Sequence, residues 1–420
     1  MQELDDQLFR REAGRMVAAL TRVFGVHNLA LAEDVVQDAL CRALEVWKFR
    51  GVPDNPSAWL MTTAKNRALD VLRRERTART FAPELGRLLE SEWTLAPTVE
   101  HLFLAPAMKD DQLRMMFSCC HPRLAEEARV ALVLHILCGF SVGEIAGAFL
   151  SGEAAIEKRI VRAKKVLAGS KRLFDLSDGA DFAARLSAVQ RALYLLFNEG
   201  YHGACPREAV RVELCREAMR LTALLLEHPL AATPATHALL ALMCLHAARL
   251  PARVDATGNL KLLFDQDRSR WDRALLNEGR SLLARSASGP ELTEYHVEAA
   301  IAAVHAAAER AEDTAWGQVV SLYDRLMEIR PSPVVALSRA LAIAQHEGPA
   351  RGLDAIRAIE DSKRLAAYPF YSAALGELEL QCGRAAIARA HFEAAVALAR
   401  NPMERRLLEK RVRACAERQE

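Results

Sequence analysis

Apolar residues recur at three- and four-residue spacing along most of this chain, and the strict alternation typical of β-strands is scarce. Ala and Leu, which both favour helices, dominate the composition of these segments. The pattern therefore predicts an all-α protein, and no segment reads as a strand.

The first part of the chain should form a small helical domain. The pattern over residues 8–48 predicts two or three helices, with a break at residues 24–30, where turn-forming residues occur. After a proline-containing loop, Asn55 or Ser57 can cap a further helix that continues to about Arg76.

Changes in pattern along the chain divide it into four parts. Residues 1–80 form the first domain, and residues 81–109, with three prolines and weak periodicity, read as a linker. Residues 110–174 form a second helical domain. From residue 175 to 420 the chain consists of Ala- and Leu-rich paired helices with little clustered basic charge.

The C-terminal part resembles tetratricopeptide-type repeats, which have a period of about 34 residues. Positions that fit the small and large packing sites of two such units are Tyr323, Pro331, Leu375, Gly376, Ala388, Phe392 and Ala395. Helical hairpins without a true repeat are the alternative.

Composition limits the other classes of protein. With 420 residues, 51% of them hydrophobic, the chain can form two or three domains with cores. Its 56 Lys and Arg nearly balance 54 Asp and Glu, so any charge that binds nucleic acid must be local. No signal peptide and no apolar run of membrane-spanning length is visible.

The nine cysteines contain no C-x-x-C pair, which favours reduced, mostly buried thiols of a cytosolic protein. Cys119 and Cys120 could suggest metal ligands, but adjacent cysteines bind one tetrahedral ion poorly, so core thiols are favoured. We expect a cytoplasmic protein with no metal, no cofactor and no membrane contact.

An acidic helix precedes a basic one in the first domain. The apolar stripe of the acidic helix is formed by Leu31, Val35, Val36, Leu40 and Leu44. Asp34, Gln37 and Asp38 lie on another part of that helix. Cations on the next helix that could neutralise phosphates are Lys65, Arg67, Arg73 and Arg74.

Two further side chains in this stretch could contact bases. The amide of Asn66 can read a base edge, and the ring of Trp59 can stack on an unpaired base. Because Trp59 opens the apolar stripe of its helix, a role as a core anchor is the favoured alternative.

The segments "AEDVVQDALCRAL" and "NPSAWLMTTAKNRALDVLRR" resemble region 2 of sigma-70 family RNA polymerase sigma factors, in the extracytoplasmic-function branch. The resemblance implies that Asp34, Gln37 and Asp38 face the clamp helices of the largest polymerase subunit. It implies that the loop at residues 53–57, with Asn55, meets the minus-10 promoter element as it melts. The same element is then contacted by Trp59, Lys65, Asn66, Arg67, Arg73 and Arg74.

Residues 126–167 read as a helix-turn-helix. Ser141 can cap a short helix, and a turn leads into a basic helix with Ile156, Ile160 and Val161 at apolar positions. This segment is similar to sigma region 4, which reads the minus-35 element and contacts the polymerase flap. The residues that would contact DNA are Glu157, Lys158, Arg159, Arg162 and Lys165.

The start of the basic helix departs from the family pattern. Glu153 and Glu157 stand where small or hydroxyl residues followed by a cation are usual. Carboxylates repel phosphates, although a Glu can accept a hydrogen bond from cytosine N4, so promoter sequence or affinity is expected to be atypical.

Two C-terminal segments are richer in polar residues than helix packing requires. Their notable side chains are Asn198, Glu199, Tyr201, Asp265, Asp267, Arg268 and Trp271. These residues could form a pocket for a ligand or partner. The favoured alternative is a buried hydrogen-bond network that docks the C-terminal part on the sigma domains. No catalytic constellation with a recognisable context is present, so we expect no enzyme.

The combined pattern predicts an alternative sigma factor that binds core RNA polymerase and promoter DNA. Its arrangement resembles the subgroup with a long tetratricopeptide-like extension, which would modulate activity and could have an unknown protein or ligand partner. A helical-repeat scaffold or ligand sensor with a sigma-like module is the rival hypothesis.

Overall fold

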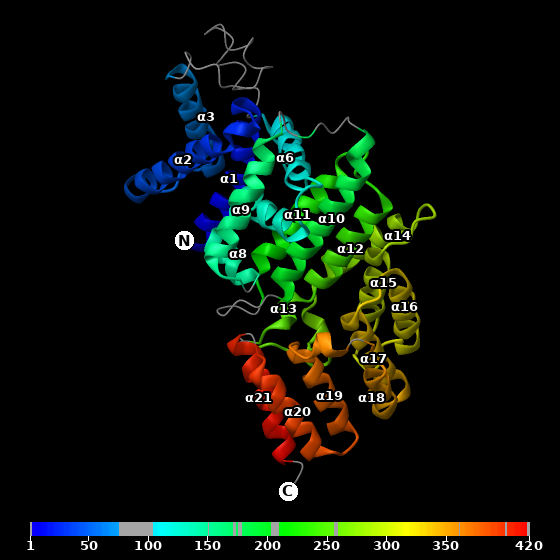
Figure 1. Cartoon of the computed structure of the whole chain (residues 1–420). Helices are drawn as coiled ribbons and strands as arrows, with labels where there is room; N and C mark the ends of the chain where they lie inside the picture. The colour runs from blue at the N-terminus through cyan, green and yellow to red at the C-terminus, as the bar shows by residue number, and fades with distance from the viewer. Residues whose placement is uncertain are drawn as a thin grey trace. The chain divides into compact units, whose positions relative to one another are not determined.

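The computed structural model of the chain describes residues 2–74, 104–149, 151–170, 174, 179–202, 210–255, 259–360, 362–399 and 401–417. The all-α prediction is confirmed, because β structure in these ranges is limited to one isolated bridge, Val254–Leu260 (Figure 1). The chain divides into two compact units, residues 1–196 and residues 197–420. Of the linker predicted at 81–109, residues 81–103 lie outside the described ranges.

Unit 1 begins with a three-helix module. Its elements are α1 (Gln2–Phe24), the 3-10 turn η1 (Val26–Asn28), α2 (Leu29–Arg50) and α3 (Pro56–Arg74). The predicted interruption after the first helix is confirmed: Gly25 has φ 86°, a conformation that L side chains rarely adopt. Both α2 and α3 pack on α1.

The second half of unit 1 contains the predicted helix-turn-helix. Its elements are α6 (Ala105–Cys119), α7 (Glu126–Leu132), the π-helical segment η2 (Val133–Leu137), α8 (Val142–Ala148), α9 (Glu153–Ala168) and α10 (Gly179–His202), which runs into unit 2. Gly139, at φ 66°, ends the segment before α8. Phe174 and Phe182 stack on Phe117 with ring centroids 5.5 and 4.9 Å apart, so the start of α10 belongs to this packing.

The two halves of unit 1 pack directly on each other. Helix α1 contacts α6 and η2, and α9 contacts η1. Gly14 of α1 lies so close to η2 that an added Cβ would be 2.0 Å from the Leu137 carbonyl oxygen. A side chain at position 14 would therefore force the two halves apart.

Unit 2 is a series of paired helices. After the end of α10 its elements are α11 (Val212–Leu226), α12 (Pro234–Ala247), α13 (Leu250–Arg253), η3 (Leu263–Asp265), η4 (Arg268–Arg270), α14 (Arg273–Ser286), α15 (Glu294–Ala307), α16 (Trp316–Ile329), α17 (Pro333–Glu347), α18 (Pro349–Arg357), η5 (Ser362–Leu365), α19 (Pro369–Gln381), α20 (Ala385–Ala397) and α21 (Pro402–Glu417). Helix α12 is buried along almost its whole length, between α11, α14 and α15. None of the helices described in either unit is long and apolar enough to cross a membrane.

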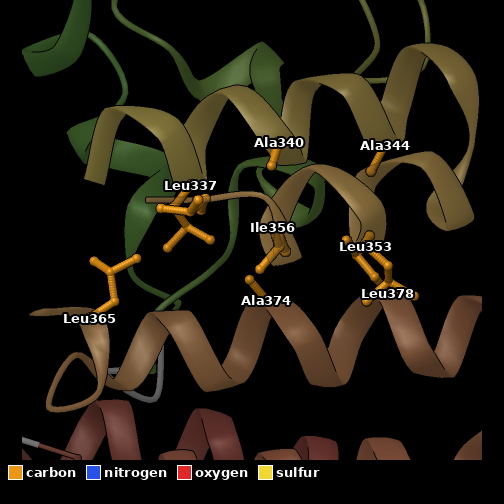
Figure 2. Packing of buried hydrophobic residues seen from close by; sticks show 9 residues of the cluster. Leu337, Ala340, Ala344, Leu353, Ile356, Leu365, Ala374 and Leu378 are labelled. Atoms are coloured by element: carbon orange, nitrogen blue, oxygen red, sulfur yellow. The ribbon is translucent and has the colours of Figure 1, made fainter. Parts of the chain in front are cut away.

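Small and large residues interlock in the later helices of unit 2. Figure 2 shows Leu337, Ala340 and Ala344 of α17 facing residues of α18 and α19, among them Leu353 and Leu378. In the α19–α20 hairpin, a Cβ on Gly376 would be 3.1 Å from the Phe392 ring, which is 1% exposed. The small residue is therefore needed where the two helices approach.

Six of the nine cysteines, at positions 119, 120, 138, 215, 244 and 415, are buried. Burial raises the pKa of Cys120 to about 12, so this thiol stays protonated and unreactive. The expectation of mostly buried thiols is confirmed. Of the other three cysteines, Cys41 is exposed, Cys382 is half-buried and Cys205 lies outside the described ranges.

Candidate polymerase and nucleic-acid surfaces

The acidic side of α2 is open to solvent. Asp34, Gln37 and Asp38 are all exposed. Arg67 Nε of α3 donates a hydrogen bond of 2.8 Å to Asp38 Oδ2, with the two side chains 40% and 54% exposed. The family resemblance assigns Asp38 to the polymerase and Arg67 to DNA, yet the two side chains pair with each other. Binding of either partner therefore competes with this ion pair.

The end of α2 also exposes apolar side chains. Leu44 is 58% exposed, and Phe49 and Val52 are 83% and 46% exposed. Placing Leu44 in the buried stripe was wrong, because the helix buries the neighbouring row that ends at Ala43 and Trp47. Apolar groups beside carboxylates are typical of a surface that another protein covers.

Trp59 anchors α3 from a half-buried position. Its ring meets Trp47 of α2 edge-on, at a centroid distance of 5.6 Å and an interplanar angle of 63°. Trp47 in turn contacts Phe9 of α1 at 5.3 Å. This chain of rings fixes three helices together and supports the anchor alternative; Trp47, which completes it, was missed by the sequence reasoning.

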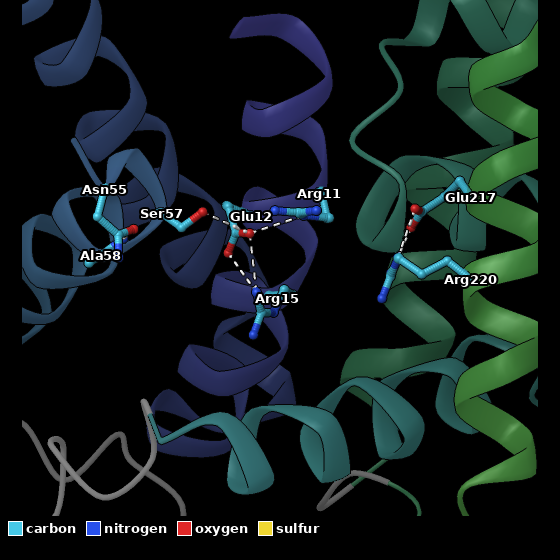
Figure 3. A network of polar contacts seen from close by, with 8 residues as sticks. All are labelled: Arg11, Glu12, Arg15, Asn55, Ser57, Ala58, Glu217 and Arg220. Carbon is cyan, nitrogen blue, oxygen red and sulfur yellow. Dashed lines mark hydrogen bonds and ion pairs between the residues drawn. The ribbon is translucent and has the colours of Figure 1, made fainter. Parts of the chain in front are cut away.

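The loop before α3 is held at two points (Figure 3). The Ala58 N–H donates to Asn55 Oδ1 at 3.1 Å, so Asn55 caps the helix. The Ser57 hydroxyl lies 3.3 Å from Oε1 of Glu12 on α1. Of the two residues that could cap α3, Asn55 therefore forms the cap, and Ser57 connects the start of the helix to α1.

Glu12 is fully buried and is the centre of this network. Arg11 Nε and Arg15 Nη1 each donate to it at 3.1 Å (Figure 3). Removing these partners would strongly destabilise the folded protein, because Glu12 would then be a buried charge without compensation. The network therefore fixes the loop of residues 53–57 to α1.

The basic side of α3 is partly described. Asn66 is exposed, while Lys65 and Arg67 are half-buried. Arg73 and Arg74 end α3, and their side chains lie outside the described part of the structure. Buried positions on the opposite side are Leu60, Ala64, Ala68, Leu69 and Leu72, which follow the helical spacing of the apolar stripe that Trp59 opens.

The helix-turn-helix begins with a capping box. The Glu144 N–H donates to Ser141 Oγ at 3.2 Å, and the Ser141 N–H donates back to Glu144 Oε2 at 2.9 Å. Burial raises the pKa of Glu144, but the hydrogen bonds from Ser141 and the charge of Arg10 outweigh it and lower the pKa overall. Ile145 and Ala146 of α8 are buried.

Helix α9 presents the expected basic surface. Its exposed polar side chains include Glu157, Lys158, Arg162 and Lys165. Of the three apolar positions named from the sequence, Ile156 and Ile160 are buried, whereas Val161 is 46% exposed because it lies one residue beyond the buried row.

Arg159 is less free than its neighbours. It lies 3.7 Å from Glu127 and places its guanidinium 5.9 Å from the Phe149 ring centroid. Together with Lys158 and Arg162 it lines a surface groove between α7 and α9. Three of the four cations predicted to contact DNA therefore share one surface.

Several ion pairs join the halves of unit 1. Lys164 Nζ of α9 donates to both carboxylate oxygens of Glu33 on α2, at 2.8 and 2.7 Å. His135 Nε2 of η2 lies 3.7 Å from the same carboxylate, and burial followed by the charge of Lys164 lowers the pKa of His135. Arg10 of α1 pairs with Glu144 of α8 at 2.5 Å.

The sequence reasoning missed this role of Glu33 and Lys164. Glu33 stood among polar residues of an amphipathic helix, and Lys164 stood in a basic run. Nothing local distinguishes a cation that pairs with a distant carboxylate from one that faces solvent.

The polar residues singled out in the C-terminal part separate into two groups. Tyr201, Arg268 and Trp271 are buried, at 1%, 9% and 3% exposure. Asp265 and Asp267 are exposed, and Asn198 and Glu199 are half-buried. Asp267 caps η4 by accepting the Ser269 N–H at 3.0 Å, which is a local structural task.

Arg249 connects two of the buried aromatic residues. Its guanidinium lies 6.0 Å from the ring centroid of Tyr201 and 5.6 Å from that of Trp271. The signal for this cluster in the sequence is that Arg249 and Arg253 stand one turn apart directly after α12, the most apolar of the described helices.

Comparisons with known proteins follow the same division. Residues 8–78 match the family model for sigma-70 region 2, and residues 114–167 match that for sigma-70 region 4. Residues 185–287 match a family of unknown function, DUF6596. An uncharacterized protein of Rhizobium meliloti (strain 1021) is 40% identical over 390 residues, covering 92% of this chain and 90% of that protein.

The chain carries two sigma-70 domains and belongs to the family of that rhizobial protein. Over 157 residues it is also 26% identical to proteins named ECF RNA polymerase sigma factor SigK from Mycobacterium sp. (strains KMS and JLS), covering 36% of this chain and 75% of theirs. The comparison with solved structures gave no significant match.

The sigma domains confirm the predicted succession of region 2, region 4 and a helical C-terminal domain. They are domains of a non-enzymatic family, which agrees with the expectation that the chain is not an enzyme.

Proposed function

We propose that this chain is an alternative sigma factor of the extracytoplasmic-function type, which binds core RNA polymerase and directs initiation at specific promoters. The observation that carries the proposal is the succession of two matched sigma domains, each with an exposed charged helix of the sign that its partner requires. We place the protein in the cytoplasm, where the polymerase is.

In this proposal region 2 binds the polymerase through α2. Asp34, Gln37 and Asp38 supply exposed polar groups for the clamp helices of the largest subunit. The exposed Leu44 and Phe49 add apolar area beside them. Core binding has to replace the Asp38–Arg67 ion pair, which frees Arg67 for the DNA backbone.

The same domain meets the minus-10 element. Asn66 and the capped loop with Asn55 face solvent on rigid supports, so they can contact separated bases with little loss of conformational freedom. Trp59 positions them through Trp47. Lys65, Arg67, Arg73 and Arg74 bind phosphates in this scheme.

Region 4 reads the minus-35 element with α9 and contacts the polymerase flap. Lys158, Arg162 and Lys165 are exposed for phosphates, and Glu157 can accept from a cytosine amino group. Arg159 must exchange Glu127 for a phosphate, so its net contribution is smaller than that of Arg162.

The packed state of unit 1 cannot occupy both promoter elements. Their centres are about 25 base pairs apart, which is about 85 Å of duplex. A compact chain of 196 residues is only about 40 Å across. Residues 75–103, fully extended, would span about 100 Å, so the chain between the two domains is long enough for them to separate.

We assign the helical domain of unit 2 a modulating role. Its hairpins, including Gly376 against Phe392, support a tetratricopeptide-like arrangement.

The test is transcription in vitro with purified core polymerase on fragmented genomic DNA, followed by sequencing of transcript starts. The full chain should give discrete starts that share sequences near minus 10 and minus 35. Co-purification with other proteins and no transcript above core enzyme alone would instead favour a scaffold or sensor.

A further inference from the structure

Cationic side chains gather around two buried rings in unit 2. Arg253 lies 4.0 Å from the ring centroid of Tyr201, and Arg268 lies 4.9 Å from that of Trp271. Arg249 lies within 6.0 Å of both rings. We call the following residues the basic-aromatic cluster: Tyr201, His246, Arg249, Arg253, Arg268, Trp271 and His305.

The guanidinium groups of this cluster are bonded to neutral acceptors. Arg249 Nε donates to Gln266 Oε1 at 3.4 Å. Arg268 Nη1 donates to the carbonyl oxygens of His305 and Ala308, at 2.6 and 2.7 Å. Arg253 Nη2 lies 3.3 Å from His202 Nδ1. Such contacts satisfy donors but supply no negative charge.

The pKa values reflect this excess of positive charge. Burial lowers the pKa of His246 well below its ordinary value, and the charges of Arg249 and Arg253 lower it further. Burial, then Arg249 and Arg268, lowers the pKa of His305 to about 4. Both imidazoles are therefore neutral at pH 7, while the three guanidiniums remain charged.

Several donors of the cluster are buried without a hydrogen-bond partner in the described structure. They are Tyr201 Oη, Arg253 Nε, Arg268 Nη2 and Trp271 Nε1, and the Nδ1 atoms of His246 and His305 are in the same state. Native proteins leave few such atoms, because each one is unfavourable. Their concentration at one place, beside three guanidiniums of which Arg268 is also attracted by the Asp313 carboxylate, indicates that a further acceptor with negative charge belongs there.

We propose that the basic-aromatic cluster binds the oxyanion group of a small molecule, a carboxylate or a phosphate, with Arg249 as the central contact. The planar guanidinium fork matches two oxygens of such a group, and Arg253 and Arg268 add charge from either side. The orphaned Tyr201 and Trp271 donors complete the coordination. The proposal concerns unit 2 alone and holds whether or not the chain acts in transcription.

The experiment is isothermal titration of the full chain with inorganic phosphate and, separately, with citrate, at constant ionic strength set by chloride. The two probes distinguish a phosphate site from a carboxylate site. Arg249→Met removes the central charge while keeping the apolar stem, and Arg249→Lys keeps the charge but loses the fork. Arg216→Met, at an exposed arginine of α11 outside the cluster, is the matched control.

At least one probe should bind the wild-type chain and the control with equal affinity. Binding to Arg249→Met should be weaker by about tenfold or more, the loss of one charge-assisted hydrogen bond. If Arg249→Met is misfolded by circular dichroism, Arg249→Lys carries the test, with a loss of roughly fivefold or more expected from its missing fork. Equal binding by a folded Arg249 variant and the control, or no binding of either probe to the wild type, would overturn the proposal.

Discussion

Replacing Glu33 by Gln should loosen the packing between region 2 and region 4. Glu33 accepts two hydrogen bonds from Lys164 and lies 3.7 Å from His135, so one carboxylate joins α2 to α9 and η2. Gln keeps the size of the side chain and removes its charge. The substitution therefore isolates the electrostatic part of the contact.

The expected loss of free energy on replacing Glu33 follows from the partial burial of the Glu33–Lys164 ion pair. The Glu33 and Lys164 side chains are 24% and 26% exposed, between a surface pair and a buried one. Exposed pairs contribute about 0.2–1 kcal/mol, whereas removing one partner of a buried pair costs about 3–5 kcal/mol. Because Lys164 can regain water, we expect a loss of about 1–2 kcal/mol, or roughly 5- to 30-fold in the opening equilibrium.

Native-state hydrogen exchange of the full chain measures this opening directly. Peptides from η1, η2 and α9 should exchange faster in Glu33→Gln, while peptides from unit 2 should not change. Glu45→Gln is the control, because Glu45 lies on the same helix, is 67% exposed and pairs only locally with Arg42. Equal protection of η1 and α9 in the two variants would refute the reasoning that this ion pair holds the domains together.

Four further substitutions test other parts of the molecule. Asp38→Arg should weaken binding to core polymerase at least about tenfold in a pull-down titration. The control is Glu393→Arg, because Glu393 is also exposed and ion-paired, and an equal loss of binding there would indicate a nonspecific charge effect. Arg162→Ala should lower promoter affinity and reduce the slope of log K against log salt by about 0.9, and an unchanged slope would remove Arg162 from the phosphate contacts. Burial raises the pKa of Asp111 to about 6, so between about pH 4 and 6 the native state binds a proton that the unfolded state has lost, and its stability falls as the pH rises through this range. Asp111→Asn should therefore raise the free energy of unfolding by up to roughly 3 kcal/mol at pH 7.5, measured by urea unfolding. An equal gain at pH 4 would contradict this assignment. Phe392→Ala should destabilise unit 2 by about 3–5 kcal/mol in thermal unfolding, because the ring is 1% exposed and fills the α19–α20 hairpin, and a change below about 1 kcal/mol would show that the hairpin collapses around the cavity.

Helix positions and exposed faces were predictable because they depend on local periodicity. The break at Gly25, the Ser141 cap and the buried row of α3 all follow from a few neighbouring residues. An error occurred at the margin of an apolar stripe. Leu44 lies one position beyond the buried row of α2, and only the packing partner decides where a stripe ends.

The candidate surfaces were predictable in part. Asp34, Asp38 and Asn66 were expected to be accessible and are exposed. Their roles in binding stay predictions. That Asp38 pairs with Arg67 could not be foreseen, because it depends on the crossing of α2 and α3.

The sequence by itself determined the helices, the order of the two sigma domains and the sign of charge on each exposed helix, because these properties are encoded within one or two helical turns. Tertiary structure alone decided which charges remain available. It paired Glu33 with Lys164 across two domains and gathered Arg249, Arg253 and Arg268 around buried rings. The physical reason is that such contacts depend on the packing of distant segments, which no local pattern specifies.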